Sequence, residues 1–353
     1  MQIFFTPGPA QLYPTFEQHL QTAVREQVGS ISHRSKQFRS IYQHTAEQLR
    51  TLLNIPPDRA ILFTGSATEV WERILQNCVE YESTHFVNGS FSKRFCEFAT
   101  ELGKETQVFN APFGEGFDVS QCAVADTSEV ICLTHNETSS GVSMPVADIH
   151  SFKKKHPSKI VAVDMVSSAP YPDLDWNLVD TAFFSVQKGF GLPAGLGVWI
   201  ANEVCLRKAE ALKTNGLYIG SHHSLPSLWK SSLNHETPAT PNVLGIYLLG
   251  KVAEDMNRMG VAAIRRETEV KAAVLYNFLE TSTLYKPAVQ NPAHRSQTVV
   301  VADVAEAPAK MASLKAHGLV IGSGYGLHKE AQVRIANFPA TTSAHIDQLI
   351  RLL

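Results

Sequence analysis

Residues 160–168 read IVAVDMVSS, and residues 181–189 read TAFFSVQKG. Both stretches begin with a short apolar run, which is typical of a strand that is buried on both faces of a parallel sheet. The first run ends on Asp164, and the second is followed by Gln187 and Lys188. The spacing between Asp164 and Lys188 leaves room for one crossover and the next strand, so we expect the two strands to be parallel.

The same pattern extends in both directions along the chain. Short apolar runs predict strands over residues 60–63, 85–87, 107–109, 130–134, 160–164 and 181–186. Helical patterns lie between them over residues 69–79, 92–102 and 146–155. Residues 196–201 predict one more strand, which we expect to pair antiparallel with residues 181–186 as an edge. The alternation predicts an α/β fold with a doubly wound, mostly parallel sheet.

The regions on either side of this sheet have a different pattern. Residues 16–54 read as one helix, with apolar positions at helical spacing. The alternation stops after about residue 205, and residues 215–241 are rich in loop-forming residues. Helices near 241–260, 261–280 and 343–353 and strands near 297–302 and 332–335 then predict a smaller α/β domain. We place the domain boundary near Met259-Gly260.

Composition excludes several classes of function. A chain of 353 residues with 44% hydrophobic residues is long enough for two domains with sizeable cores. A net charge of -2, without long charged runs, argues against a nucleic-acid partner and against a polybasic membrane anchor. The five cysteines form no pattern typical of metal ligands, so we expect no metal. Ordinary thiols and no evident signal peptide or membrane span lead us to expect a cytoplasmic protein.

Four polar clusters follow the predicted strands, and all four should lie at one edge of the sheet. They are residues 65–68 (Gly-Ser-Ala-Thr) before a helix, residues 136–138 (Asn-Glu-Thr), Asp164, and Gln187-Lys188. Taken singly, each has an ordinary explanation as a helix cap, a turn or a surface charge. Ligands of doubly wound folds bind beyond the carboxyl ends of the strands, so the set as a whole indicates a binding site.

The chemistry of the set fits pyridoxal phosphate. A helix N-terminus suits its phosphate, a carboxylate suits its pyridinium nitrogen, and a lysine can form a Schiff base with its aldehyde. Phe91, which follows Asn88-Gly89-Ser90, is placed to stack on the ring. We therefore expect pyridoxal 5'-phosphate as the cofactor.

Longer motifs carry a resemblance to a known family. They include Pro7-Gly8-Pro9-Ala10, Ser32-His33-Arg34-Ser35-Lys36-Gln37-Phe38, His135-Asn136-Glu137-Thr138, Asp164-Met165-Val166-Ser167-Ser168, Gln187-Lys188 with Gly191 and Pro193-Ala194-Gly195, Thr237-Pro238-Ala239-Thr240, and His328-Lys329 with Arg334. In this order and spacing they resemble the class V, fold type I aminotransferases, and within them the branch that acts on phosphoserine. The resemblance implies a large seven-stranded cofactor domain over residues 16–258 and a small domain over residues 259–353 together with residues 1–15.

The resemblance also implies roles for the cofactor site. Lys188 would be the Schiff-base lysine and proton shuttle, and Asp164 would hold the pyridinium. Thr138 would bond the 3-hydroxyl group, and Phe91 would replace the tryptophan that usually stacks on the ring. The phosphate would be held by the backbone of Ala67 and Thr68, with Gln187 and Thr237 of the partner subunit.

For the substrate, the resemblance implies two anion sites. Arg334 would clamp the α-carboxylate, because a planar guanidinium suits bidentate binding. His33 and Arg34 from the other subunit, with His328 and Lys329, would hold the second anionic group, which is phosphate in phosphoserine and the γ-carboxylate in glutamate. The implied protein is a homodimer with shared active sites. The implied reaction is ping-pong transamination between O-phospho-L-serine and 2-oxoglutarate, a step of serine biosynthesis.

Some residues depart from the family pattern and keep alternatives open. The Ser66-Ala67-Thr68 turn is more similar to the alanine–glyoxylate branch, so alanine–glyoxylate or serine–pyruvate transamination is the alternative reaction. Glu236 stands where the family has Asn, and beside a phosphate its carboxylate must point away or be paired. Lys329 stands where Arg is usual. Cysteine desulfuration would need a nucleophilic cysteine on a late loop, and no cysteine follows Cys205. A binding module on the same fold would not need both Asp164 and Lys188.

Overall fold

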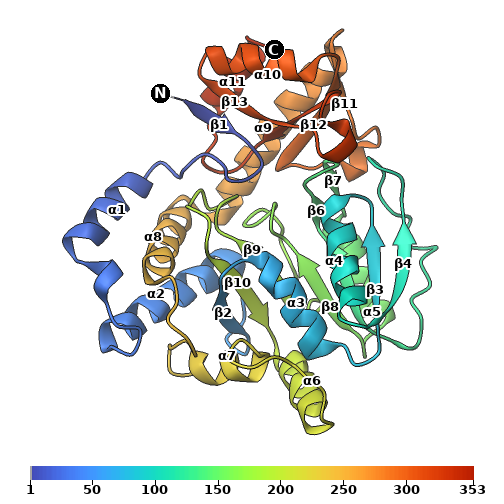
Figure 1. The fold of residues 1–353 in the computed structure, drawn as a ribbon. Coiled ribbons are helices and arrows are strands. Elements are labelled where there is room, and N and C mark those ends of the chain that lie inside the picture. The colour runs from blue at the N-terminus through green and yellow to red at the C-terminus, as the bar shows by residue number, and fades with distance from the viewer. Residues whose placement is uncertain (1) are drawn as a thin grey trace.

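The computed structural model describes residues 2–353, which form two sheets with helices around them (Figure 1). The larger sheet has seven strands in the order β2-β10-β9-β8-β5-β3-β4. Its strands are β2 (Ala60–Thr64), β3 (Glu82–Val87), β4 (Glu105–Asn110), β5 (Ser128–Thr134), β8 (Ile160–Asp164), β9 (Thr181–Ser185) and β10 (Gly197–Ala201). The pairs from β9 to β4 are all parallel, and only β10 runs antiparallel to its neighbours. The predicted α/β class with a large, mostly parallel sheet is confirmed.

Strand β10 corrects one detail of the prediction. We expected residues 196–201 at an edge of the sheet, but β10 pairs with β9 on one side and with β2 on the other. All five residues of β10 are buried, as are all five of β2. An apolar run of this kind shows that a strand is buried, but it does not show which strand will pair with it.

Residues of the central strands alternate between two apolar layers. Val161 and Val163 of β8 pack in one layer, together with residues of α2 (Lys36–Leu53) and α8 (Val243–Met259). Ile160 and Ala162 pack in the other layer, together with residues of α3 (Ala67–Cys78), α4 (Ser90–Glu101) and α6 (Glu203–Thr214). Each Val, Leu or Phe side chain buried in this way contributes about 1.5–3 kcal/mol. Helices on both faces make the sheet doubly wound.

The first predicted helix, over residues 16–54, is two helices. Helix α1 (Phe16–Arg25) ends before Gln27, whose φ of 53° is left-handed, and the short turn η1 (Val28–Ser30) follows. Helix α2 begins after Ser35, whose side chain accepts a hydrogen bond of 3.1 Å from the N–H of Phe38. Residues 28–32 read VGSIS, and glycine, serine and β-branched residues there favour a break. The loop-rich stretch after residue 215 also contains a helix, α7 (Leu225–Ser232).

The second sheet lies at the end of the molecule where both chain termini lie (Figure 1). Its order is β1-β13-β14-β12-β11, formed by β1 (Ile3–Phe5), β11 (Tyr285–Pro287), β12 (Val299–Val304), β13 (Leu319–Ser323) and β14 (Gln332–Ala336). Helices α9 (Val261–Thr281), α10 (Ala307–Ala316) and α11 (Ser343–Ile350) contribute residues to its apolar cluster. Gly260, with a φ of 84°, joins α8 to α9. The domain boundary at this glycine stays a prediction.

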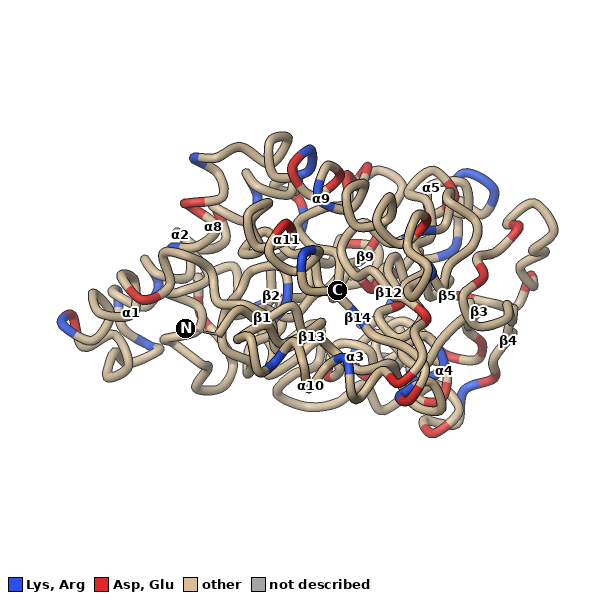
Figure 2. Tube along the Cα trace, turned by 90° about the horizontal axis from the view of Figure 1, so that it is seen from above, with Lys and Arg blue, Asp and Glu red and all other residues tan. Residues whose placement is uncertain are grey.

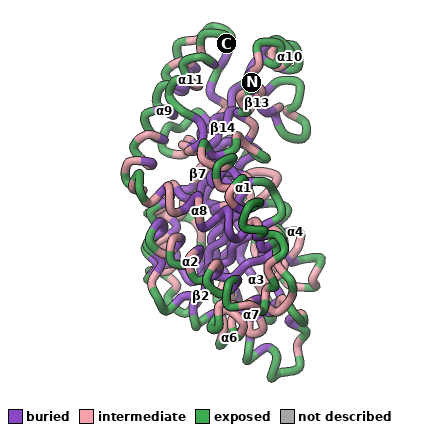
Figure 3. Tube along the Cα trace, turned by 90° about the vertical axis from the view of Figure 1, so that its left-hand side faces the viewer, coloured by how far each residue is buried: buried purple, intermediate pink, exposed green. Residues whose placement is uncertain are grey.

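Short elements complete the chain. They are the hairpin of β6 (Asn136–Glu137) and β7 (Val142–Ser143), helix α5 (Val146–Lys155), and the turns η2 (Pro292–His294) and η3 (Gly326–His328). Acidic and basic residues are interspersed along most elements (Figure 2). Buried residues form the interior, while the outer helices expose much of their surface (Figure 3). Across residues 2–353, every helix is too short or too polar to cross a membrane.

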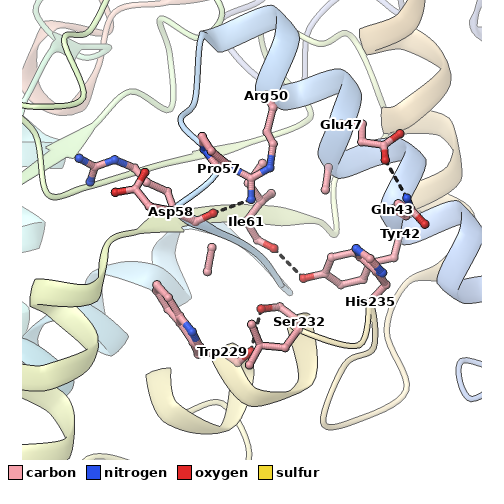
Figure 4. A pocket seen from close by; sticks show the side chains of 14 residues that line it. Tyr42, Gln43, Glu47, Arg50, Pro57, Asp58, Ile61, Trp229, Ser232 and His235 are labelled. Carbon is pink, nitrogen blue, oxygen red and sulfur yellow. Dashed lines mark hydrogen bonds between the residues drawn. The ribbon is translucent and has the colours of Figure 1, made fainter.

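The free edge of β2 is covered by side chains. The Tyr42 hydroxyl donates to the Ile61 carbonyl at 2.6 Å, and Nη2 of Arg50 donates to the Arg59 carbonyl at 2.6 Å (Figure 4). A cavity of about 310 Å³ lies here, with Tyr42 and Arg50 of α2 on one side and Trp229 of α7 on another (Figure 4). An exposed strand edge is prone to pair with another chain, and these contacts protect it.

Candidate active site

The polar clusters that follow the strands line one cavity. It has a volume of about 130 Å³ and lies beyond the carboxyl ends of β5, β8 and β9. Its lining residues are Ser66, Ala67, Thr68, Trp71, Phe91, Thr134, Asn136, Thr138, Asp164, Val166, Ser185, Gln187 and Lys188. The register of the sheet places these residues together. Thr134 of β5 is paired with Asp164 of β8, and Asp164 is paired with Phe183 of β9, so the three strands end at the same level. All seven predicted cofactor residues of one chain, which are Ala67, Thr68, Phe91, Thr138, Asp164, Gln187 and Lys188, line this cavity.

Asp164 lies at the end of β8 and is only 3% exposed. Its two carboxylate oxygens each accept one hydrogen bond of 2.8 Å, Oδ1 from the N–H of Val166 and Oδ2 from Nε1 of Trp71. Burial raises the pKa of Asp164 to about 6, against the effect of these two hydrogen bonds and of the Lys188 charge. A cationic group bound beside it would favour the charged carboxylate.

Lys188 follows β9 and is 8% exposed. Its Nζ donates to Oγ1 of Thr138 at 3.2 Å and lies 5.3 Å from the centre of the Phe91 ring. Burial lowers the pKa of Lys188 to about 8; the negative charge of Asp164 opposes this shift, and the positive charge of Arg334 adds to it. An amine with this pKa is partly neutral near pH 8, so it can act as a nucleophile and as a base.

The N-terminal turn packs directly on this lysine. A Cβ atom on Gly8 would lie 2.9 Å from Cε of Lys188, and the φ of Gly8 is 134°. Both the close approach and the positive φ require glycine here. This gives a structural reason for the Pro7-Gly8-Pro9 turn of the sequence.

The N-terminus of α3 forms one wall of the cavity. Ser66 caps the helix by accepting from the N–H of Glu69 at 3.1 Å, and the N–H of Ala67 donates to Oγ of Ser185 at 2.8 Å. The N–H of Thr68 belongs to the first turn, whose amides have no acceptor within the helix. The helix dipole adds a favourable field for a negative charge at this end.

A wider cavity of about 540 Å³ adjoins the first one. Phe91, Thr138, Gln187 and Lys188 line both cavities. The wider cavity also has Arg334 of β14, residues 6–9 and residues 321–323 in its lining, so both sheets contribute to it. Space for a substrate thus lies between Lys188 and Arg334.

Arg334 is held in place by backbone and aromatic groups. Its Nε donates to the Ser323 carbonyl at 2.7 Å, and its Nη1 lies 3.3 Å from the Thr138 carbonyl. The guanidinium lies 5.3 Å from the ring centre of Tyr325, and that ring lies 5.2 Å from the ring of Phe91. The two aromatic rings therefore form one side of the substrate space.

The other predicted substrate residues lie outside these two cavities within one chain. His33 and Arg34 precede α2, and Nη1 of Arg34 lies 3.5 Å from Oε2 of Glu236. His328 stacks on Phe113 with a ring separation of 4.0 Å, and Lys329 follows it at the end of η3. Arg334 and Lys188 line the same cavity. The four residues predicted for the second anion site, His33, Arg34, His328 and Lys329, line neither cavity.

The carboxylate of Glu236 is paired with two arginine side chains, Arg34 and Arg39. Besides Arg34, Nε of Arg39 donates to Oε1 of Glu236 at 2.9 Å. The next residue, Thr237, lines a separate cavity of about 140 Å³ together with Gly65 and His223. Two arginines of the same chain therefore compensate the carboxylate beside Thr237.

Some residues of the site were not predicted from the sequence. Trp71 and Ser185 hold Asp164 and Ala67, and Tyr325 lines the wider cavity. Trp71 lies one helical turn after Ala67, so a helix that begins at the anion-binding turn places both residues on the same face. No sequence pattern around Tyr325 indicates a binding site, because its place in the wider cavity depends on the packing of the second sheet against the first.

Comparison with known proteins agrees with this geometry. Residues 4–349 match the family model described as aminotransferase class-V. A phosphoserine aminotransferase of Rhodococcus opacus is 28% identical over 98% of this chain and 93% of its own. The crystal structure of a phosphoserine aminotransferase from Cytophaga hutchinsonii is 48% identical, with a TM-score of 0.98 over 100% of this chain and 98% of that chain. An aspartate aminotransferase from Thermus thermophilus, 24% identical with a TM-score of 0.84 over 99% and 97% of the two chains, shares the fold.

Proposed function

This chain belongs to the class V aminotransferase family, and from that premise we propose that it is a phosphoserine transaminase. The reaction interconverts two pairs of compounds by moving one amino group. O-phospho-L-serine and 2-oxoglutarate are one pair, and 3-phosphohydroxypyruvate and glutamate are the other. The reaction is a step of serine biosynthesis. The observation that carries the proposal is the meeting of Asp164, Lys188 and the α3 N-terminus around one cavity that adjoins Arg334. The relatives named phosphoserine aminotransferase support the choice of substrate.

The residues of the smaller cavity fit pyridoxal phosphate. The N-terminus of α3 and Gln187 suit the phosphate, and Thr138 suits the 3-hydroxyl group. Each oxygen of Asp164 accepts a single protein hydrogen bond, so lone pairs remain for a pyridinium N–H. Phe91 supplies an aromatic face, and Nζ of Lys188 suits the aldehyde.

When bound, the cofactor draws away the electron pair that is left at the substrate's Cα after deprotonation. Lys188 would accept the proton from that carbon as general base and release it again as general acid within the same half of the exchange, and the second half would run these proton transfers in reverse. Its pKa of about 8 suits both roles near neutral pH. Asp164 keeps the opposite charge that a protonated ring nitrogen requires.

Arg334 positions the substrate for this proton transfer. Its guanidinium binds the α-carboxylate in bidentate fashion, with Tyr325 and Phe91 excluding water from one side. The second anionic group of the substrate is held by His33 and Arg34 of the other subunit, with His328 and Lys329. Arg34 and Thr237 lie outside the two cavities of their own chain, so the roles proposed for them require a homodimer whose subunits share each site.

Transamination of alanine with glyoxylate, or of serine with pyruvate, is the second candidate. It is favoured by the pairing of Arg34 with Glu236, which lowers the positive charge available to a phosphate. A substrate without a second anion would need only Arg334.

A half-reaction separates the two candidates. The protein is saturated with pyridoxal phosphate, and O-phospho-L-serine or L-alanine is added while the absorbance change to the pyridoxamine form is followed. Fast conversion with phosphoserine alone supports the proposed reaction, and conversion with alanine alone supports the second candidate. A protein that fails to bind pyridoxal phosphate would contradict both.

A further inference from the structure

The carboxylate of Glu137 is fully buried, and no basic side chain forms an ion pair with it among residues 2–353. A buried charge of this kind is costly unless hydrogen bonds compensate it. Glu137 does not line the cofactor cavity, although its neighbours Asn136 and Thr138 do. The mechanism above therefore leaves this carboxylate without a role.

Five donors converge on the two oxygens of Glu137. Oε2 accepts from the N–H of Phe91 at 3.1 Å, the N–H of Ser92 at 2.8 Å and the hydroxyl of Ser92 at 2.8 Å. Oε1 accepts from the N–H and the hydroxyl of Ser139, at 3.0 and 2.7 Å. The donors of Phe91 and Ser92 belong to the first turn of α4, so Glu137 supplies the negative charge that this helix end favours.

Gly89, the residue before α4, packs directly against the side chain of Glu137. A Cβ atom on Gly89 would lie 2.3 Å from Cγ and 2.5 Å from Cδ of Glu137. The N–H of Ser90 donates to Oγ of Ser139 at 2.9 Å, which ties the same helix end to the loop after β6. The start of α4 is thus attached to the loop of Glu137 through several hydrogen bonds and one close packing contact.

The helix end that Glu137 holds carries an aromatic ring of the cofactor cavity. Phe91 is the second residue of α4, and its ring lies 5.3 Å from Nζ of Lys188. We propose that Glu137 is a positioning residue, which fixes the backbone of Phe91 so that its ring stacks on the bound cofactor. The inference rests on the proposed function, because it takes pyridoxal phosphate as the group under Phe91.

The test is the affinity for pyridoxal phosphate of the full-length apoprotein with Glu137→Gln. The substitution keeps the shape but directs an amide NH₂ at backbone N–H donors, so α4 must shift at Phe91. We expect the dissociation constant to rise at least roughly tenfold and the visible circular dichroism of the bound cofactor to change. Glu97→Gln, on the exposed side of the same helix, should leave both unchanged.

A double-variant cycle distinguishes positioning from simple helix capping. If Glu137 acts through the Phe91 ring, Glu137→Gln will weaken binding in the wild-type background and have little effect in a Phe91→Leu background. Additive losses, or an affinity for pyridoxal phosphate within twofold of wild type with unchanged dichroism, would overturn the inference. A lower melting temperature alone would indicate a cap and would also overturn it.

Ser139→Ala repeats the cycle if Glu137→Gln does not fold. It removes the hydroxyl that donates to Glu137 and accepts from the N–H of Ser90, and it keeps the charge of Glu137. We expect a smaller rise in the dissociation constant that also disappears in the Phe91→Leu background. The proposed function is judged separately, because wild-type protein that binds no pyridoxal phosphate would contradict that function rather than the role of Glu137.

Discussion

Nε1 of Trp71 donates a hydrogen bond of 2.8 Å to Oδ2 of Asp164, and both residues line the cavity of about 130 Å³. Trp71→Phe removes this donor but keeps an aromatic ring. We expect the pKa of Asp164 to rise above about 6, since one of the interactions that lower it is lost. A hydrogen bond to a charged group is worth about 1.5–3 kcal/mol, so pyridoxal phosphate should bind roughly tenfold more weakly or worse.

The measurement for Trp71→Phe is a titration of apoprotein with pyridoxal phosphate at pH 6 and pH 8. The loss should be greater at pH 6, where more of the Asp164 population is protonated. Trp229→Phe on α7 is the matched control, because that residue lines the cavity beside β2. Equal affinity for the Trp71→Phe and Trp229→Phe proteins would contradict the role of Trp71.

The pKa of Lys188 determines the pH dependence that we expect for the proton-transfer step. Its pKa of about 8 lies below the ordinary 10.5 because of burial. As general base it must be neutral, so the single-turnover rate should rise with pH through about pH 8 and then level off. Lys188→Ala should lower this rate at least about a thousandfold, within the range of general-base effects. A rate that falls across pH 7–9 would contradict the assignment.

The raised pKa of Asp164 determines how we expect the stability of the apoprotein to change with pH. Its pKa is about 6 in the folded protein and ordinarily 3.8, as in the unfolded chain, so the folded state binds the extra proton between these values. The unfolding free energy contributed by Asp164 is therefore constant below pH 3.8 and falls as pH rises from 3.8 to about 6. Asp164→Asn should relieve up to ~3 kcal/mol of this cost at pH 7 and little at pH 4.

Thermal unfolding of apo Asp164→Asn at the two pH values checks this expectation. The same variant should lower the affinity for pyridoxal phosphate, because the carboxylate that pairs with the ring nitrogen is lost. Asp173→Asn, on an exposed side chain, serves as the control. An equal change in melting temperature at pH 4 and pH 7 would contradict the raised pKa.

The local pattern of the sequence was sufficient to predict the central strands. The bounds predicted for residues 146–155 and 160–164 agree with α5 and β8, because an uninterrupted apolar run or a helical pattern has clear ends there. The position of β10 between β9 and β2 could not be predicted in this way. Pairing depends on which other strand has a free edge, and that information is distributed over the whole chain.

The candidate site was predictable to the same extent. Asp164 and Lys188 follow strands, so the general rule for doubly wound sheets placed them together. Glu137 was grouped with ligand-binding polar residues of a turn, but its carboxylate binds the start of α4 instead. Its partners Phe91 and Ser92 lie far before it in the sequence, and no local pattern indicates contacts of that range.

The pairing of Glu236 with two arginines predicts how substrates are distinguished. Arg34 and Arg39 both contact Glu236 and are exposed to a similar degree, 58% and 46%. Only Arg34 is assigned to the second anion of the substrate, across the proposed dimer interface. Arg34→Ala should lower kcat/KM for phosphoserine about a hundredfold, as expected for a lost bidentate contact to phosphate, and should change alanine turnover less than about threefold. Arg39→Ala, as the matched control, should affect both substrates only slightly, whereas similar losses in the two variants would place Arg34 outside the substrate site.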